Sequence, residues 1–121
     1  MVAPRRVLLV DDHDDARELL RELCILRGHV VAEAYDGPSG IETALAFRPD
    51  VAFVDIKLPQ LDGYDVARAL RDRMGTTCPR LVALSGLGSS HALDLARAAG
   101  FDDYVVKPID AKRLEVLITG A

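Results

Sequence analysis

Several features that are common in proteins are missing or scarce in this chain. Of its 121 residues none is tryptophan, and only 5% are aromatic. No apolar run approaches the roughly 20 residues of a membrane-spanning helix, and the first residues lack the charged-then-apolar pattern of a signal peptide. We therefore expect a cytoplasmic protein with no membrane insertion.

Cysteine is also scarce. Cys24 and Cys78 are the only two, and two unclustered thiols build neither a disulfide framework nor a metal site. Cys24 lies within a helical pattern of apolar residues, where a free cysteine behaves as a small hydrophobic residue. We expect Cys24 to pack in the core without a chemical role.

Positive charge is not concentrated anywhere along the chain. The 15 lysine and arginine residues are scattered among 19 acidic ones, and the formal net charge is −4. A protein that follows a nucleic-acid backbone usually carries a basic stripe, which this pattern does not contain. We therefore expect no direct binding to nucleic acid.

What the sequence does contain is a regular alternation of apolar runs and amphipathic segments, which predicts alternating strands and helices. The expected strands cover residues 7–10, 30–34, 51–55, 81–85 and 103–106. The first, third and fourth runs have no polar alternation, which is typical of parallel strands covered by helices on both faces. Because a chain of this length forms one domain, we expect residues 1–121 to be a single doubly wound α/β sandwich with no output domain.

Helix ends are marked by particular residues. Asp36 and Asp110 are expected to cap the second and fifth helices, and Ser89 or Ser90 the fourth. The five helices are expected to end at Gly28, Arg48, about Arg73, Gly100 and about Thr119.

Four of the apolar runs end in polar residues that can carry chemistry. Asp11 and Asp12 follow the first run, Asp55 ends the third, Ser85 ends the fourth and Lys107 follows the fifth. The carboxyl ends of parallel strands lie along one edge of a sheet, where open α/β sheets bind their ligands. These side chains are therefore expected to meet.

Each aspartate alone has a plainer explanation, because an aspartate after a strand often caps a helix or forms a turn. Asp55 fits that explanation less well, since Ile56 continues the apolar run and a nearly buried carboxylate needs a partner. Three converging carboxylates raise one another's pKa, and a divalent cation removes the repulsion. Hard oxygen ligands of this kind favour Mg²⁺ or Mn²⁺.

The remaining side chains suit a phosphoryl group. Lys107 is a compact cation and Ser85 a hydrogen-bond donor, so each can hold one oxygen of a phosphoryl group in transfer. One carboxylate can then act as the nucleophile and form an aspartyl phosphate. Asp55 is the candidate acceptor because it lies alone on the central strand, and Asp11 and Asp12 would hold the metal.

Five separated motifs then indicate a family. They are VLLVDD at 7–12, AYDGPSGIETAL at 34–45, RPDVAFVDIKLPQLDGYDVARALR at 48–71, LVALSG at 81–86 and AGFDDYVVKPID at 99–110. On these motifs, the chain resembles the receiver domain of bacterial two-component response regulators over nearly its whole length. The resemblance implies a flavodoxin-like fold with strand order 2-1-3-4-5. It also implies phosphorylation of Asp55 by a histidine kinase or histidine phosphotransfer protein.

The resemblance implies roles for individual residues as well. By position, Asp11 and Asp12 match the acidic pair of receivers, Lys57 supplies a backbone carbonyl to the metal, Ser85 and Tyr104 match the switch residues, and the Lys107–Pro108 bond is a cis candidate. A static, half-buried Tyr104 is the alternative to its switch role. A receiver of this kind is a signalling domain, which catalyses only its own phosphorylation and dephosphorylation.

The expected output surface consists of the last two helices and the strand between them. Its charged side chains are Asp94, Arg97, Asp103, Lys112 and Arg113. They could pair across a homodimer or contact a downstream protein, and an ordinary solvated surface explains them equally well. The stretches DIKLPQLDGYDVARALR and GFDDYVVKPID are most similar to receivers of hybrid histidine kinases, so the chain is either a stand-alone receiver or part of such a kinase.

Three residues depart from the common receiver pattern. His13 follows the acidic pair, where it either approaches the metal site or stays in solvent, and we expect a solvated loop residue. Lys57 places a second cation beside Asp55, and Leu87 is apolar two residues after Ser85. Both flank the path of a hydrolytic water, so Leu87 is expected to slow loss of the phosphate, and Lys57 to offset or alter that effect.

Two other functions stay open. Asp12-His13-Asp14 is similar to the DxD motif of haloacid-dehalogenase-type phosphatases, in which Asp12 would be the nucleophile. Asp15, however, stands where that motif has a small threonine or valine. The second alternative is a phosphorylation-independent interaction module on the receiver fold. Modules of that kind usually lack an acidic residue or the lysine, and this chain keeps all of them.

Overall fold

The computed structural model describes residues 3–86 and 90–120. Its elements alternate in the order β1 (Arg6–Val10), α1 (Asp14–Leu26), β2 (Val30–Ala34), α2 (Gly37–Phe47), β3 (Val51–Asp55), α3 (Gly63–Met74), a short 3₁₀ turn (Gly75–Thr77), β4 (Arg80–Ser85), α4 (Ser90–Ala99), β5 (Asp103–Val106) and α5 (Ala111–Thr119). Every expected strand is present, and β1 and β4 each begin one residue earlier than the sequence indicates. Among the described residues, no helix has the length and apolar character needed to cross a bilayer.

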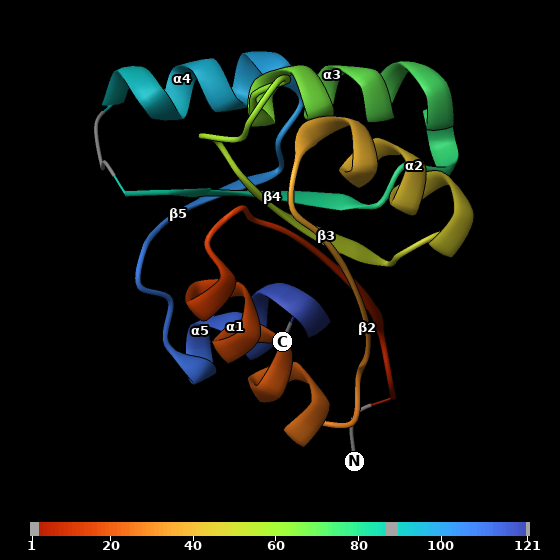
Figure 1. Cartoon of the computed structure of the whole chain (residues 1–121), viewed down its shortest axis with the longest axis vertical. Coiled ribbons are helices and arrows are strands. Elements are labelled where there is room, and N and C mark those ends of the chain that lie inside the picture. The colour runs from red at the N-terminus through yellow and green to blue at the C-terminus, as the bar shows by residue number, and fades with distance from the viewer. Residues whose placement is uncertain (1–2, 87–89, 121) are drawn as a thin grey trace.

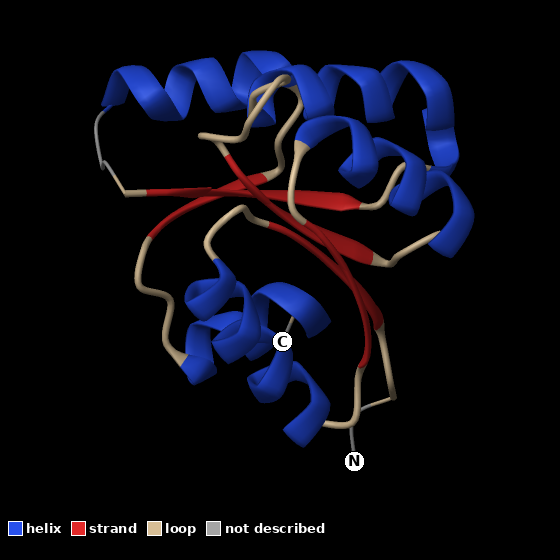
Figure 2. Ribbon diagram, viewed as in Figure 1, coloured by secondary structure: helices blue, strands red, loops and turns tan. Residues whose placement is uncertain are grey.

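The five strands form one parallel sheet in the order β2-β1-β3-β4-β5. Helices α2, α3 and α4 cover one face, and α1 and α5 cover the other (Figures 1 and 2). The central strand β3 is buried at all five positions, which explains why its sequence shows no polar alternation. The predicted doubly wound fold with strand order 2-1-3-4-5 is confirmed.

Side chains of each strand alternate between two apolar clusters, one on each face of the sheet. On β1, Leu8 and Val10 pack in the cluster beneath α2, α3 and α4, whereas Val7 and Leu9 pack in the cluster above α1 and α5. Phe53 is the largest fully buried side chain and belongs to the second cluster. Burial of such a side chain stabilises the fold by roughly 1.5–3 kcal/mol.

Aspartate caps fix where three of the helices begin. Asp36, Asp62 and Asp110 each accept a hydrogen bond from the backbone N–H three residues later, at 2.8, 2.9 and 2.7 Å. The caps at Asp36 and Asp110 were expected. The cap at Asp62 was not, because Pro59 and Gly63 predict a loop over residues 56–63. Gly28, with φ of 86°, follows α1 as predicted. Of the two expected caps of α4, Ser90 is its first residue and Ser89 lies outside the described residues.

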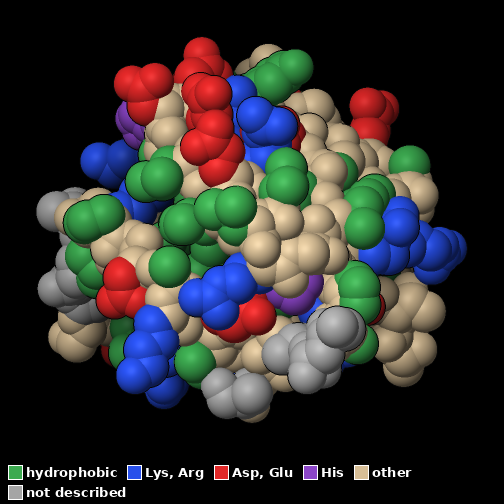
Figure 3. Space-filling model, turned by 90° about the horizontal axis from the view of Figure 1, so that it is seen from below, with side chains coloured by type: hydrophobic (Ala, Val, Ile, Leu, Met, Phe, Trp, Pro, Cys, Tyr) green, Lys and Arg blue, Asp and Glu red, His purple; other side chains and the backbone are tan. Residues whose placement is uncertain are grey.

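The charged side chains are dispersed over the face of the folded chain that α1 and α5 form (Figure 3). Figure 3 shows the face formed by α1 and α5, where basic, acidic and apolar side chains are interspersed. Leu19, Ile25 and Leu26 of α1 are among the exposed large apolar residues.

The two thiols are expected to differ in reactivity. Cys24 is fully buried, as predicted, and burial together with the negative charge of Glu115 raises its pKa to about 12. At pH 8 the fraction of thiolate at Cys24 is therefore about 10⁻⁴. Cys78 is half-buried, and burial raises its pKa as well. Iodoacetamide at pH 8, followed by mass spectrometry, should label Cys78 slowly and Cys24 only in denaturant. Equal labelling of both thiols in the folded protein would contradict this packing.

Candidate functional site

The carboxyl ends of the strands bring four of the predicted side chains together. Asp11 and Asp12 lie in the turn after β1, Asp55 is the last residue of β3, and Lys107 directly follows β5. The ends of β4 and β5 are joined because the Lys107 N–H donates a hydrogen bond to the Ser85 carbonyl at 2.7 Å. The site therefore occupies the edge of the sheet that the sequence indicates.

Lys107 connects the two most buried carboxylates. Its Nζ atom lies 2.7 Å from Asp11 Oδ2 and 3.0 Å from Asp55 Oδ2. Asp11 is 1% exposed and Asp55 4% exposed, so neither charge is effectively solvated by water. A buried charge needs a partner, and the ammonium of Lys107 serves both.

The three groups shift one another's protonation equilibria. Burial raises the pKa of Asp55, and the negative charge of Asp11 adds to this increase, so the net shift is upward although Lys107 opposes it. Burial also acts to raise the pKa of Asp11, but its hydrogen bonds with Lys107 and the His13 N–H outweigh burial and lower it. Burial would lower the pKa of Lys107, and the two carboxylates more than compensate and raise it.

The backbone around Asp55 is held closely. The Lys57 N–H donates to Asp55 Oδ1 at 3.1 Å, which fixes the second carboxylate oxygen, while the Lys57 side chain is exposed. Gly63 packs against the same residue, because a Cβ there would overlap the backbone carbonyl of Asp55. The Lys107–Pro108 peptide bond is cis, the isomer that the resemblance implies.

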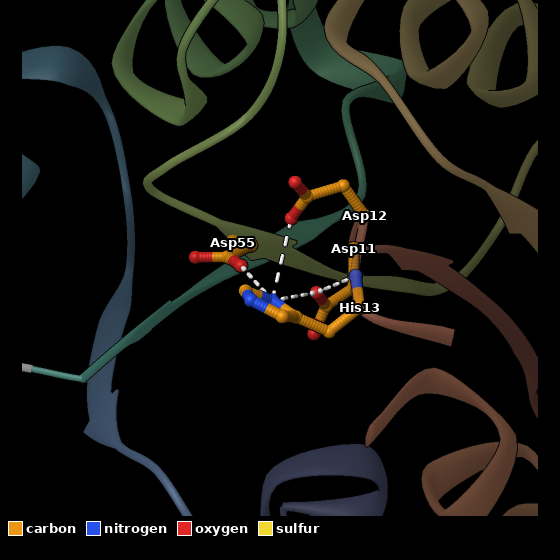
Figure 4. Close-up of side chains that lie close together, drawn as sticks. All are labelled: Asp11, Asp12, His13 and Asp55. Carbon is orange, nitrogen blue, oxygen red and sulfur yellow. Dashed lines mark hydrogen bonds and ion pairs between the residues drawn. The ribbon is translucent and has the colours of Figure 1, made fainter. Parts of the chain in front are cut away.

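Three carboxylates and an imidazole form the only group of potential metal ligands among residues 3–86 and 90–120. One ligand atom each from Asp11, Asp12, His13 and Asp55 lies within 4.8 Å of the others (Figure 4). Carboxylate oxygens are the ligands that Mg²⁺ and Mn²⁺ prefer, so the residues present fit a divalent cation.

His13 combines the two alternatives that the sequence left open. Its side chain is 67% exposed, as a loop histidine should be, yet its Nδ1 atom lies 3.2 Å from Asp11 Oδ1 and 3.3 Å from Asp12 Oδ1. The ring therefore joins the acidic group instead of staying away from it. The negative charges of Asp11 and Asp12 attract the polar edge of the imidazole. The position of the ring is set by the side-chain rotamer, which the sequence pattern does not indicate.

Comparison with known proteins agrees with this geometry. The family model of the response regulator receiver domain matches residues 7–119. The chain belongs to the response-regulator receiver family. It is 40% identical over 110 residues to the transcriptional regulatory protein CseB of Streptomyces coelicolor, covering 91% of this chain and 46% of CseB. It is 38% identical to the response regulator MprA of Mycobacterium ulcerans, covering 90% of this chain and 46% of MprA.

The receiver is also similar to solved structures. The chemotaxis response regulator CheY4 of Vibrio cholerae superposes with a TM-score of 0.86 at 25% identity, covering 93% of this chain and 94% of CheY4. The receiver domain of the sensor histidine kinase PA1611 from Pseudomonas aeruginosa has a TM-score of 0.87 at 26% identity, covering 98% of this chain and 100% of that domain. A magnesium ion is coordinated in the active-site cleft of the PA1611 domain. This receiver spans about half the length of CseB and MprA, 46% in each case.

Arg17 supports the site and was not predicted from the sequence. Arg17 is only 8% exposed, and its Nη1 atom donates to the backbone carbonyl of Asp11 at 2.6 Å. Its other donors reach Asp14 at 2.7 Å and Glu33 at 3.2 Å, and its guanidinium lies over the ring of Tyr35. A signal was present, because Arg17 shares a helical face with the buried residues Leu20 and Cys24. A charge on an apolar face indicates a buried partner.

Loss of the Arg17 contacts should weaken the turn that carries Asp11. Arg17→Met keeps the aliphatic bulk but removes every hydrogen bond, so we expect the free energy of unfolding to fall by about 1–3 kcal/mol. The matched control is Arg21→Met, since Arg21 is 39% exposed and lies 3.7 Å from Glu33. We expect that control to change stability by less than about 0.5 kcal/mol. Urea unfolding followed by circular dichroism distinguishes the two, and equal losses would contradict the role of Arg17.

The remaining predicted residues, Ser85 and Tyr104, lie near this edge of the sheet. Both are half-buried, Ser85 as the last residue of β4 and Tyr104 within β5. Tyr104 packs against the apolar cluster beneath α2, α3 and α4. It also lines a hollow on the α4-β5-α5 side of the receiver, together with Leu93, Arg97 and Arg113. Leu87, the third departure from the common pattern, lies outside the described residues.

Proposed function

We propose that Asp55 accepts a phosphoryl group from the phosphohistidine of a histidine kinase or a histidine phosphotransfer protein. The observation that supports this most strongly is the pairing of Asp55 with Lys107 at the end of the central strand. Asp55 is 4% exposed and lies 3.0 Å from the Lys107 ammonium. Removing these charges from water costs free energy, and buried charged groups with shifted pKa values cluster at functional sites.

The transfer requires little from the protein beyond positioning and charge. An oxygen of Asp55 attacks the phosphorus atom, the P–N bond of phosphohistidine breaks, and the imidazole takes the electron pair. Lys107 already contacts one carboxylate oxygen of Asp55, so its ammonium can hold an oxygen of the incoming phosphoryl group. The Ser85 hydroxyl can donate to another. Positioning and neutralisation of charge account for nearly all of such catalysis.

We assign the metal to Asp11, Asp12, Asp55 and the backbone carbonyl of Lys57. Bound Mg²⁺ or Mn²⁺ would neutralise part of the negative charge that the carboxylates and the phosphoryl group bring together. The hard oxygen donors of the three aspartates support this assignment.

The proposed output is a shift between two conformations. Phosphorylation changes their populations only if the phosphoryl group interacts better with one of them. Ser85 and Tyr104 are the proposed switch residues. Ser85 ends β4 at the edge of the sheet that carries the site, and Tyr104 on the neighbouring strand β5 lines the hollow on the α4-β5-α5 side. The target is a downstream protein or a second copy of the chain bound at α4, β5 and α5. Since CseB is a transcriptional regulatory protein, a DNA-binding region acting beside the receiver is one form of target.

The phosphorylation is tested with phosphoramidate, a small phosphoryl donor that replaces the partner. Intact-mass spectrometry should detect one added phosphoryl group per chain in Mg²⁺ and none in EDTA. Phosphorylation that is independent of metal, or the absence of phosphorylation in Mg²⁺, would overturn the proposal. The switch is tested with beryllofluoride and Mg²⁺, which should shift the amide resonances around Asp55, Ser85 and Tyr104. Unchanged resonances would favour an interaction module that works without phosphate.

A further inference from the structure

The imidazole of His13 lies close to all three carboxylates of the site although the side chain is exposed. Its Nδ1 atom lies 3.2 Å from Asp11 Oδ1, 3.3 Å from Asp12 Oδ1 and 3.6 Å from Asp55 Oδ2. Figure 4 shows the ring edge pointing to all three carboxylates from the turn between β1 and α1. The His13 backbone N–H also donates to Asp11 Oδ1 at 2.9 Å, so main chain and ring converge on the same oxygen.

These separations match those of atoms that share one metal ion. Ligands at about 2.1 Å from an octahedral metal lie about 3.0 Å from their neighbours in the coordination sphere. The distances from Nδ1 to Asp11 Oδ1 and Asp12 Oδ1, 3.2 and 3.3 Å, are close to that spacing, and the distance to Asp55 Oδ2 is longer, at 3.6 Å. All four ligand atoms lie within 4.8 Å of one another. Opposite ligands of an octahedral metal at about 2.1 Å are about 4.2 Å apart, so the four atoms occupy a region of about the size of one coordination sphere.

The surrounding contacts leave the imidazole available to a metal. Lys107 takes the other oxygen of Asp11, Oδ2, and leaves Oδ1 on the side of His13. The His13 side chain is 67% exposed, so its Nε2–H can stay hydrated while Nδ1 offers its lone pair. A neutral imidazole bound in this way adds a nitrogen ligand without adding charge.

We infer that His13 is a further metal ligand and that it gives this site a preference for late first-row divalent ions such as Co²⁺, Ni²⁺ and Zn²⁺. This inference rests on the metal site of the proposed function. Imidazole nitrogen binds these ions more strongly than it binds Mg²⁺, which prefers oxygen and retains its waters. A site that offers only carboxylate oxygens would discriminate less between these ions and Mg²⁺.

Of the other two histidines, one provides a control variant and the other has partners elsewhere. His91 is exposed on α4, away from the acidic group, and is the matched variant site. His29 is engaged elsewhere, because its Nδ1 atom accepts from the Arg5 N–H at 3.0 Å and its Nε2 atom lies 2.9 Å from Glu115. His13→Asn keeps a polar loop side chain while removing the imidazole.

The first test is pulsed electron paramagnetic resonance of the full chain with Mn²⁺ alone. We expect modulation from a directly bound ¹⁴N nucleus in the wild type and in His91→Ala, and its loss in His13→Asn. The second test is calorimetric titration with Ni²⁺ and Mg²⁺ separately. His13→Asn should lose at least about tenfold in Ni²⁺ affinity and change Mg²⁺ affinity less than about twofold.

The two tests distinguish the role of His13 from the metal site that the three aspartates form. If Mg²⁺ and Mn²⁺ bind but no nitrogen modulation is seen and the Ni²⁺ affinity of His13→Asn equals that of the wild type, His13 is not a ligand. The metal site of the proposed function then stands without it. If neither Mg²⁺ nor Mn²⁺ binds the wild type, the proposed metal site is wrong and the role of His13 is overturned with it.

Discussion

Asp55→Asn is expected to abolish phosphorylation of the receiver, with the rate of phosphoryl incorporation falling by at least about 10³-fold. The amide keeps the size and shape of the side chain but has no anionic oxygen to attack phosphorus. Lys107 keeps its 2.7 Å contact with Asp11, so the variant should still fold. The measurement is a time course of intact mass with phosphoramidate and Mg²⁺, with circular dichroism to verify folding.

Asp12→Asn is the matched control for that experiment. The Asp12 side chain is 35% exposed and is proposed to contact the metal, so its loss should weaken Mg²⁺ binding and leave the acceptor intact. At saturating Mg²⁺ we expect this variant to be phosphorylated, more slowly than the wild type. If Asp12→Asn abolishes phosphorylation while Asp55→Asn does not, the nucleophile is Asp12 and the haloacid-dehalogenase-type alternative is favoured.

Lys107→Met should cause the largest loss of stability among the site variants. The substitution leaves two nearly buried carboxylates, Asp11 and Asp55, without the ammonium that now contacts both. Removing one partner of a buried ion pair costs about 3–5 kcal/mol, and because Lys107 is 21% exposed we expect a loss of about 2–3 kcal/mol in EDTA. Phosphorylation should also slow by about 10²-fold, as when one charge-stabilising donor is removed.

Two variants show whether that loss comes from the carboxylates. Lys57→Met removes an exposed cation beside the site and should change stability by less than about 0.5 kcal/mol. The double variant Lys107→Met/Asp55→Asn has one buried carboxylate fewer, so it should recover part of the lost stability. Urea unfolding in EDTA measures all of these variants. A double variant no more stable than Lys107→Met alone would contradict the pairing.

The main parts of the fold could be predicted because they depend on periodic patterns and strand ends. An uninterrupted apolar run such as 51–55 can be buried on both faces only in a sheet covered on both sides, and β3 is buried in this way. The convergence of Asp11, Asp55 and Lys107 followed from parallel strand order alone. The cap at Asp62 was missed, because the neighbouring proline and glycine indicate a loop over the same residues.

The parts that could not be predicted depend on side-chain conformation. The ring of His13 approaches three carboxylates through a rotamer that no spacing in the sequence encodes. Arg17 is charged, so the sequence pattern does not predict that it is buried on the apolar face of α1. Its hydrogen bond to the Asp11 carbonyl spans six residues and depends on how far α1 is rotated against β1.

Mapping the phosphorylated residue shows whether Asp55 is the phosphoryl acceptor. Borohydride reduces an aspartyl phosphate to homoserine and leaves an unmodified aspartate unchanged. After phosphorylation in Mg²⁺, reduction and digestion, mass spectrometry should find homoserine at position 55. Homoserine at position 12, or a phosphoryl group on a histidine with no reduced aspartate, would exclude Asp55 as the acceptor.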